Sequence, residues 1–208
     1  MARLERDFPL FPLGLVALPA EFVPLHIFEE RYRTMIGLCI DEEREFGIVW
    51  ATEDGLQPVG CAMEIAQVLE RMEDGRINVL TRGTRVFRLI AEQDDLPYPA
   101  GTVEFLDDEE ETAPDEAAGE AARKAYAELV EEATDKELEE DELEAMNSYD
   151  MAATVDFGLE AKQELLDLRS ESARLAFVAR LFRAATRRLD FIERAQARAR
   201  SNGKVRFG

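Results

Sequence analysis

The spacing of apolar residues changes period near the middle of the chain, and no other feature constrains the fold as strongly. Residues 8–105 contain short apolar runs that alternate with polar residues or are broken by proline and glycine, which is typical of strands. After residue 117, apolar residues recur at intervals of three and four, which is typical of helices. The sequence therefore predicts an α+β fold in which a strand-rich half precedes a helical half.

We predict six or seven short strands in the first half. The apolar runs that predict them are Phe8–Leu18, Phe22–Phe28, Phe46–Trp50, Pro58–Arg71, Arg76–Leu80, Thr84–Ile90 and Thr102–Leu106. Proline has no backbone N–H to donate, so Pro9 and Pro12 predict that the first run is an edge strand or an irregular one. Residues 29–44 are the exception, because Tyr32 and Met35 begin one face of a helix. Many short strands with one helix indicate a small closed or half-closed β-barrel.

Composition divides the chain into four segments. We predict a β domain over residues 1–106, an acidic linker over 107–116, a helical bundle over 117–201 and a flexible tail over 202–208. Pro114 and the surrounding acidic run indicate the linker. Three or four helices follow it, and Ser170 is a natural N-cap for the last one, which contains Phe177 and Phe182.

The chain is strongly acidic, with 45 acidic against 25 basic residues and a net charge of −20. Residues 104–144 hold 19 acidic and 3 basic residues, a net −16, whereas residues 185–208 hold 7 basic and 2 acidic ones, a net +5. A negative surface repels phosphate groups, so nucleic acid and anionic membranes are poor partners for most of the protein. At the basic end, Arg194–Arg206, interaction with the dipole of a helix C-terminus explains the charges better than nucleic-acid binding does.

The sequence lacks the motifs that build an active site. It has neither the GxxxxGK[ST] loop that holds phosphates nor the GxSxG turn that presents a nucleophile. His26 is the single histidine and lies in an apolar run, where a structural histidine held by a local hydrogen bond is the simplest interpretation. Cys39 and Cys61 lack partner ligands for a metal and are interpreted as small buried apolar residues. We therefore predict no catalytic residue, no cofactor and no metal, and a protein that is not an enzyme.

The sequence also carries no recognisable address. Its first residues mix Arg3, Glu5 and Arg6 with apolar residues, unlike the apolar core of a signal peptide. No apolar run approaches the roughly 18 residues that a transmembrane helix needs. We therefore expect a cytoplasmic protein with no membrane partner.

Six motifs follow one another across the first half of the chain. They are Phe8–Leu13, Pro24–Tyr32, Phe46–Val49, Val59–Cys61 with Ala66, Asp74–Arg76 and Thr81–Phe87. In this order, they resemble the substrate-binding N-terminal domain of the Lon protease family, and PLHIFEERY at residues 24–32 resembles a hallmark of its stand-alone members. Lys162–Leu166 resembles the helical half that follows in that family.

The resemblance implies a PUA-like β pseudo-barrel followed by an α-helical bundle. Within the motifs, Gly75 suits a turn position with positive φ, and Gly83 marks a bulge or a close approach of two backbones. Full-length Lon continues into an ATPase and a Ser-Lys peptidase, whereas this sequence ends at Gly208 without their motifs. The peptidase name that relatives carry therefore implies no peptidase activity for this chain.

The resemblance also implies the kind of partner. In Lon this domain helps to capture unfolded or marked proteins, so we expect a role in protein quality control and recognition of unfolded or apolar segments, by strand addition or in an apolar groove. The Pro-rich N-terminal strand is a candidate edge. Candidate contacts are Phe11, Leu13, Phe22 and Trp50, although a core position is the simpler interpretation of each.

Three alternatives stay open at this point. The acidic helices over residues 104–144 suit a regulatory or structural protein, or an adaptor, that docks on one specific protein partner. A PUA-like fold also suggests RNA binding, but this rests on analogy between folds alone. An enzyme of an unrecognised type is the third alternative.

Overall fold

The computed structural model describes residues 4–109 and 115–202. The predicted tail at 202–208 lies outside these residues except for Asn202, and so do residues 110–114 of the predicted linker. Seven strands precede most of the helices: β1 (Leu4–Leu13), β2 (Phe22–Ile27), β3 (Phe46–Thr52), β4 (Gly55–Leu56), β5 (Val59–Arg71), β6 (Ile77–Gln93) and β7 (Ala100–Phe105). The helices are α1 (Glu30–Asp41), α2 (Glu116–Thr134), α3 (Glu140–Ala145), α4 (Ser148–Ala152), α5 (Leu159–Asp167) and α6 (Glu171–Asn202). The predicted α+β class, with a strand-rich half before a helical half, is confirmed.

Two compact units divide the chain differently from the predicted domains. The barrel unit combines Met1–Glu110 with Tyr149–Ser170, and the helical unit combines Glu111–Ser148 with Glu171–Gly208. Residues 149–170, which we assigned to the helical bundle, thus pack with the strands. Most of α4 and all of α5 belong to this inserted segment.

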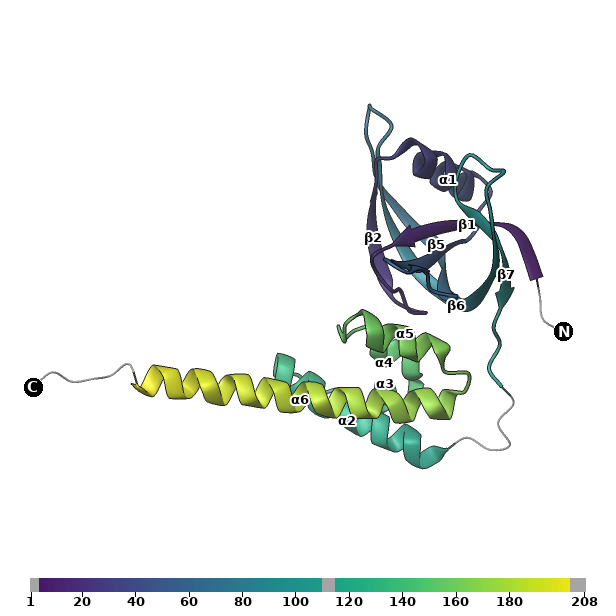
Figure 1. The fold of residues 1–208 in the computed structure, drawn as a ribbon. Helices are drawn as coiled ribbons and strands as arrows, with labels where there is room; N and C mark the ends of the chain where they lie inside the picture. The colour runs from purple at the N-terminus through teal and green to yellow at the C-terminus, as the bar shows by residue number, and fades with distance from the viewer. Residues whose placement is uncertain (1–3, 110–114, 203–208) are drawn as a thin grey trace, which may run out of the picture. The chain divides into compact units, whose positions relative to one another are not determined.

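The strands of the barrel unit close into a ring (Figure 1). Their order is β1–β7–β6–β5–β3, and β1 also pairs with β3 in parallel, which joins the two ends. The prediction that the Pro-rich first strand forms an edge is wrong, because its start pairs with β7 and its end with β3. The alternative prediction of an irregular strand is confirmed by a register shift between Glu5 and Phe8 and a φ of 54° at Asp7.

Strand β6 is one continuous strand where we predicted two. Its first half pairs with β2 and its second half with β7, while β5 pairs along most of its length. Gly83 lies at the change of partner, and a Cβ there would lie 2.0 Å from the carbonyl oxygen of Leu18. The predicted bulge and close approach at Gly83 are therefore confirmed, because the β5–β6 register also shifts between Ala62 and Met63. The predicted turn glycine, Gly75, has a φ of 85°.

Helix α1 and the strands share the main apolar core. Tyr32, Met35, Ile36 and Cys39 of α1 are buried against the strands, as their spacing predicted. Burial of apolar surface contributes about 25 cal/mol per Å² to folding, so this face fixes α1 on the barrel (Figure 1).

Helix α5 is held on the barrel by polar contacts as well as apolar ones. Gln163 donates from Nε2 to the backbone oxygen of Val59 at 3.1 Å, and Lys162 Nζ lies 2.5 Å from Glu21 Oε1. Leu165 and Leu166 are buried beside these contacts. This combination explains why α5 packs with the strands, although its sequence pattern is that of any amphipathic helix.

Helices α2 and α6 lie side by side and run in the same direction (Figure 1). Asp115 caps α2 by accepting from the N–H of Ala118, and its own N–H donates to Ser172 Oγ in the first turn of α6. Further along the pair, the rings of Tyr126 and Phe182 lie 5.2 Å apart. These contacts form the core of the helical unit.

Candidate functional site

Strands β2, β6 and β5 lie side by side and turn one face to solvent. Residues that oppose one another in antiparallel strands project their side chains on the same face of the sheet. The register therefore arranges the solvent-facing side chains in three cross-strand rows. These rows, which we call the outer face, are Phe22–Arg82–Glu64, Pro24–Leu80–Gln67 and His26–Asn78–Glu70.

The opposite face of the same strands belongs to the core. Leu25 and Ile27 of β2 and Val79 of β6 are buried there, alternating in sequence with the residues of the outer face. This alternation fixes the register, since a shift of one residue would exchange the two faces. The core therefore determines which side chains β2 presents to solvent.

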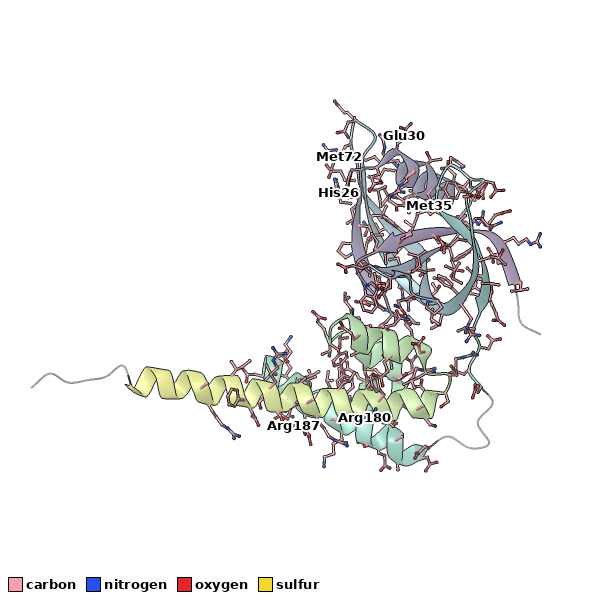
Figure 2. The ribbon with its side chains drawn as sticks, viewed as in Figure 1. His26, Glu30, Met35, Met72, Arg180 and Arg187 are labelled. Atoms are coloured by element: carbon pink, nitrogen blue, oxygen red, sulfur yellow. The ribbon has the colours of Figure 1, made fainter. Side chains whose placement is uncertain are left out.

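A hydrogen-bonded chain runs along the third row. His26 Nδ1 lies 2.6 Å from Asn78 Oδ1, and Asn78 Nδ2 donates to Glu70 Oε2 at 3.0 Å. Because a carbonyl oxygen can only accept, the hydrogen of this bond must sit on Nδ1, which leaves Nε2 of a neutral imidazole as an acceptor. The predicted hydrogen bond of His26 is present, but its partner lies on the neighbouring strand β6, and the side chain is exposed on the outer side of β2 (Figure 2).

The first row combines an aromatic ring with an ion pair. The guanidinium carbon of Arg82 lies 5.9 Å from the centre of the Phe22 ring, and Arg82 Nη1 lies 3.9 Å from Glu64 Oε1. These contacts leave Phe22 57% exposed. The positive charge of Arg82 is therefore paired with the carboxylate of Glu64 in the same row.

Large apolar side chains surround the outer face without being covered. Phe28, directly after β2, is 60% exposed, and Leu69 of β5 is 51% exposed. The Phe28 ring stacks on His26 with 5.9 Å between the ring centres. Phe22 and Phe28, at the two ends of β2, and Leu69 of β5 are thus three of the exposed large apolar side chains of the described chain. Exposed apolar side chains that gather at one place are typical of interaction sites.

An open groove of about 480 Å³ lies on this face, and of these three exposed apolar residues it is Leu69 that lines it. Its walls come from β2, β5 and β6, and its lining residues are Pro24, Leu25, His26, Leu69, Glu70 and Asn78. The groove is thus lined both by apolar residues and by the hydrogen-bonded third row.

The outer edge of β2 pairs with no other strand among residues 4–109 and 115–202. The backbone oxygens of Glu21 and Val23 accept bonds from Gly83 N and Thr81 Oγ1, so these peptide groups point toward β6. Because peptide groups alternate in direction along a strand, those of the even-numbered residues of β2 point to the open edge. Pro24 is one of them and supplies no N–H, which limits how far another strand can pair there.

The four predicted contact residues lie in three different settings. Phe11 is buried in the core, where its ring centre lies 4.1 Å from that of Tyr32. Leu13 and Trp50 are half-buried and are register partners in β1 and β3. Phe22 is exposed on the outer face, away from that pair in the strand register. The structure therefore brings together Leu13 and Trp50 but does not unite all four residues.

Most residues of the groove were absent from the sequence-based prediction. Pro24, His26, Asn78, Glu70 and Leu69 were not selected as contacts, although one signal was available. In residues 22–28, every second residue of an apolar run has to face away from the core. Applied to that run, this rule would have selected Pro24 and His26 together with Phe22.

Other site types find little support in the described part of the chain. Within it, no group of three or more His, Cys, Asp or Glu side chains is arranged to hold a metal ion. No helix found there has the length and apolar composition to cross a membrane. Cys39 and Cys61 are buried free thiols, as predicted, and burial raises the pKa of the Cys39 thiol to about 11 and that of Cys61 further still.

The decisive comparison is with models of protein families. The model of the ATP-dependent protease La (LON) substrate-binding domain matches residues 7–183, which include the whole outer face. The chain belongs to this family. The resemblance inferred from the motifs is thereby confirmed, and the matched region is the substrate-binding domain of Lon rather than its ATPase or peptidase.

Solved structures of Lon N-terminal domains share this fold. A Lon N-terminal domain protein from Xanthomonas campestris matches with a TM-score of 0.62 and 22% identity, over 81% of this chain and 94% of that one. The N-terminal domain of the Mycobacterium avium complex Lon protease matches with a TM-score of 0.64 and 21% identity, over 86% and 98% of the two chains. The Lon substrate-binding domain fold thus spans most of both units, and within it the outer face is the candidate binding surface.

Proposed function

We propose that this chain is a non-catalytic binding module that holds an extended, apolar polypeptide segment on the outer face. The observation that carries this proposal is an open groove on the outer face, lined in part by Pro24 and the exposed Leu69, on a strand that carries the exposed Phe22 at its start and Phe28 after its end. Membership of the Lon substrate-binding family supports a polypeptide as the ligand. Unfolded proteins expose such segments, so the proposal extends to a role in protein quality control.

Two kinds of contact would hold the segment. Its apolar side chains cover Phe22 and Leu69, which removes apolar surface from water. Its backbone pairs over a short length with the open edge of β2, as in other complexes formed by strand addition. Pro24 limits this pairing, so side-chain contacts dominate the affinity and long strands are disfavoured.

The other three predicted contacts take different parts in the proposal. Leu13 and Trp50 form a secondary contact surface, because they are adjacent in register and only half-buried. Phe11 supports the site from the core. We assign no catalytic step to any of these residues.

Binding of one labelled peptide by matched variants tests the proposal. The probe is a capped fluorescent octapeptide of alternating leucine and serine, and fluorescence anisotropy gives its Kd. Truncating an exposed aromatic anchor typically costs more than about 1 kcal/mol, so we expect Phe22→Ala to raise Kd about tenfold. The control is Phe191→Ala, which removes another exposed phenylalanine, on α6, and leaves Kd unchanged. Equal Kd values for the unchanged protein, Phe22→Ala and Phe191→Ala, or no saturable binding, would contradict the proposal.

A second candidate function is docking of one specific protein partner on the acidic helices. Helix α3 favours it, because none of its residues is buried and its first turn holds Glu140, Asp141 and Glu142. Reversing these three charges would weaken such a partner and reduce the salt dependence of its binding. An unchanged affinity would remove this candidate.

The buried thiols support a reducing compartment such as the cytoplasm. Cys39 and Cys61 are both unpaired, whereas secreted proteins commonly pair their cysteines. A cytoplasmic location also gives access to nascent and unfolded chains. Separation of soluble and membrane fractions of the source cells, followed by immunodetection, checks this location.

A further inference from the structure

The third row of the outer face presents acceptors and no free cation. Asn78 uses its carbonyl oxygen for His26 and its amide for Glu70, so both of its neighbours are oriented by it. Glu70 Oε1 and His26 Nε2 are then left as acceptors beside the groove. A group that donates several hydrogen bonds, such as an ammonium or a guanidinium, matches this arrangement.

The charges around the groove leave Glu70 unbalanced. Arg82 pairs with Glu64, Arg76 with Asp74 and Arg31 with Glu29, and Arg71, which follows Glu70 in β5, forms no ion pair with it in the described part of the chain. Over residues 4–109 and 115–202, the structure shows no ion pair between a cationic side chain and Glu70. The net charge of −20 also attracts cationic partners to the protein as a whole.

Apolar side chains flank these acceptors. Leu69 lies on the same groove, and Phe28 stacks on the imidazole of His26. A lysine or arginine side chain has an aliphatic stem that packs on apolar surface while its charged end stays in contact with polar groups. The groove therefore offers separate surfaces for the two parts of one basic side chain.

We infer that the row His26–Asn78–Glu70 selects a lysine or arginine side chain within the bound apolar segment. This inference rests on the proposed function and adds a specificity to it. The ligands are then extended segments in which a basic residue lies among apolar ones. Glu70 makes the ion pair, Asn78 holds Glu70 and His26 in place, and Nε2 of His26 accepts a second hydrogen bond.

Three matched peptides test the inference. Each is the leucine–serine octapeptide described above with one central residue changed to lysine, norleucine or glutamate, and anisotropy gives the Kd of each. Exposed ion pairs contribute up to about 1 kcal/mol, so we expect lysine to bind about fivefold tighter than norleucine, and glutamate to bind most weakly. Equal affinity for lysine and norleucine would overturn the inference and leave the proposed function standing.

Variants separate a local ion pair from attraction by the whole acidic protein. Glu70→Gln keeps the hydrogen bond from Asn78 but removes the charge, so we expect the fivefold preference for lysine over norleucine to disappear. Glu92→Gln changes the net charge equally on the distant half of β6 and should keep the preference. A preference that survives Glu70→Gln, or that Glu92→Gln also abolishes, overturns the inference. If no peptide binds, the proposed function is wrong and the inference falls with it.

Discussion

The barrel unit and the helical unit are stabilised in different ways. In the barrel unit, apolar side chains fill the interior and backbones approach so closely that some positions admit only glycine. In the helical unit, a polar cluster lies between Ser148 and the first turn of α6. Glu171 accepts from Ser148 N and Oγ at 2.7 Å each, and the buried Arg174 donates to both residues.

This difference concerns how each unit responds to substitution. A close-packed interior is most sensitive to added volume, because a new atom has no space to enter. A buried polar cluster is most sensitive to the loss of a partner, because the remaining groups keep the cost of desolvation. Substitutions of each kind should therefore affect one unit more than the other.

The largest effect should follow from Gly83→Ala in the barrel unit. The new Cβ would lie 2.0 Å from the backbone oxygen of Leu18, so either β6 or the connection between β1 and β2 that holds Leu18 must move. We expect a loss of about 4 kcal/mol in the free energy of unfolding, measured by urea denaturation with Trp50 fluorescence. Gly14→Ala is the control, because a Cβ there meets nothing within 4 Å. A loss below about 1 kcal/mol would show that β6 tolerates a side chain at position 83, where it approaches the backbone of Leu18.

The next effect should follow from Arg174→Met in the helical unit. Methionine keeps much of the volume but leaves Glu171 and Ser148 without their buried cation. We expect a loss of about 3 kcal/mol, seen in the circular dichroism at 222 nm, to which the helices contribute most. Arg183→Met, at an exposed position of α6, should change stability little. If the unfolding transition measured by Trp50 fluorescence shifts by the same amount as the transition measured by dichroism, the two units unfold together. Their stabilities then do not differ as the comparison of the two units requires.

The sequence predicted those parts of the fold in which one local rule decides the outcome. Asp74-Gly75 predicted a turn, and Gly75 has positive φ. The predicted run Pro58–Arg71 corresponds to β5, Val59–Arg71. Long-range pairing was harder to foresee. We predicted two strands, Arg76–Leu80 and Thr84–Ile90, whereas β6 continues from one into the other and changes partner between them.

The candidate site depends on features that local pattern does not encode. Strand β5 advances from Glu64 to Gln67 to Glu70 while β6 advances by two residues each time, because the register shifts after Ile65 and again after Val68. These shifts place Glu70 opposite Asn78. Strict alternation along β5 would have placed Gln67 on the opposite face of the sheet from Glu64 and Glu70. The side chains of the groove could therefore be predicted on β2, but not on β5.

A smaller and pH-dependent effect should be confined to the barrel unit. Burial raises the pKa of Cys39 to about 11 from an ordinary value of 9.0, and it also raises the pKa of Cys61, Tyr32 and Tyr98. The unfolded chain then releases these protons at lower pH than the folded one, so the stabilising contribution is complete below pH 9 and is lost as the pH rises toward 11.

Urea denaturation at two alkaline pH values measures this effect. Between about pH 8 and about pH 10, we expect the stability reported by Trp50 to fall by about 2–3 kcal/mol, mostly from the two thiols. Cys39→Ala should reduce the slope with pH, although it lowers stability at both values. A stability that stays constant over this range would show that the cysteine thiols and the hydroxyls of Tyr32 and Tyr98 reach solvent in the folded barrel.

The smallest effect on stability should come from Phe22→Ala on the outer face. Phe22 is more than half exposed, so its truncation should change the free energy of unfolding by no more than about 0.5 kcal/mol. Leu25→Ala, on the opposite face of the same strand, should cost about 3 kcal/mol. The two substitutions thus separate folding from binding within β2: Phe22→Ala weakens the peptide complex in a stable protein, and Leu25→Ala destabilises the barrel. A loss above about 2 kcal/mol for Phe22→Ala would mean that the ring supports the fold, and the outer face would then no longer be a surface free for a ligand.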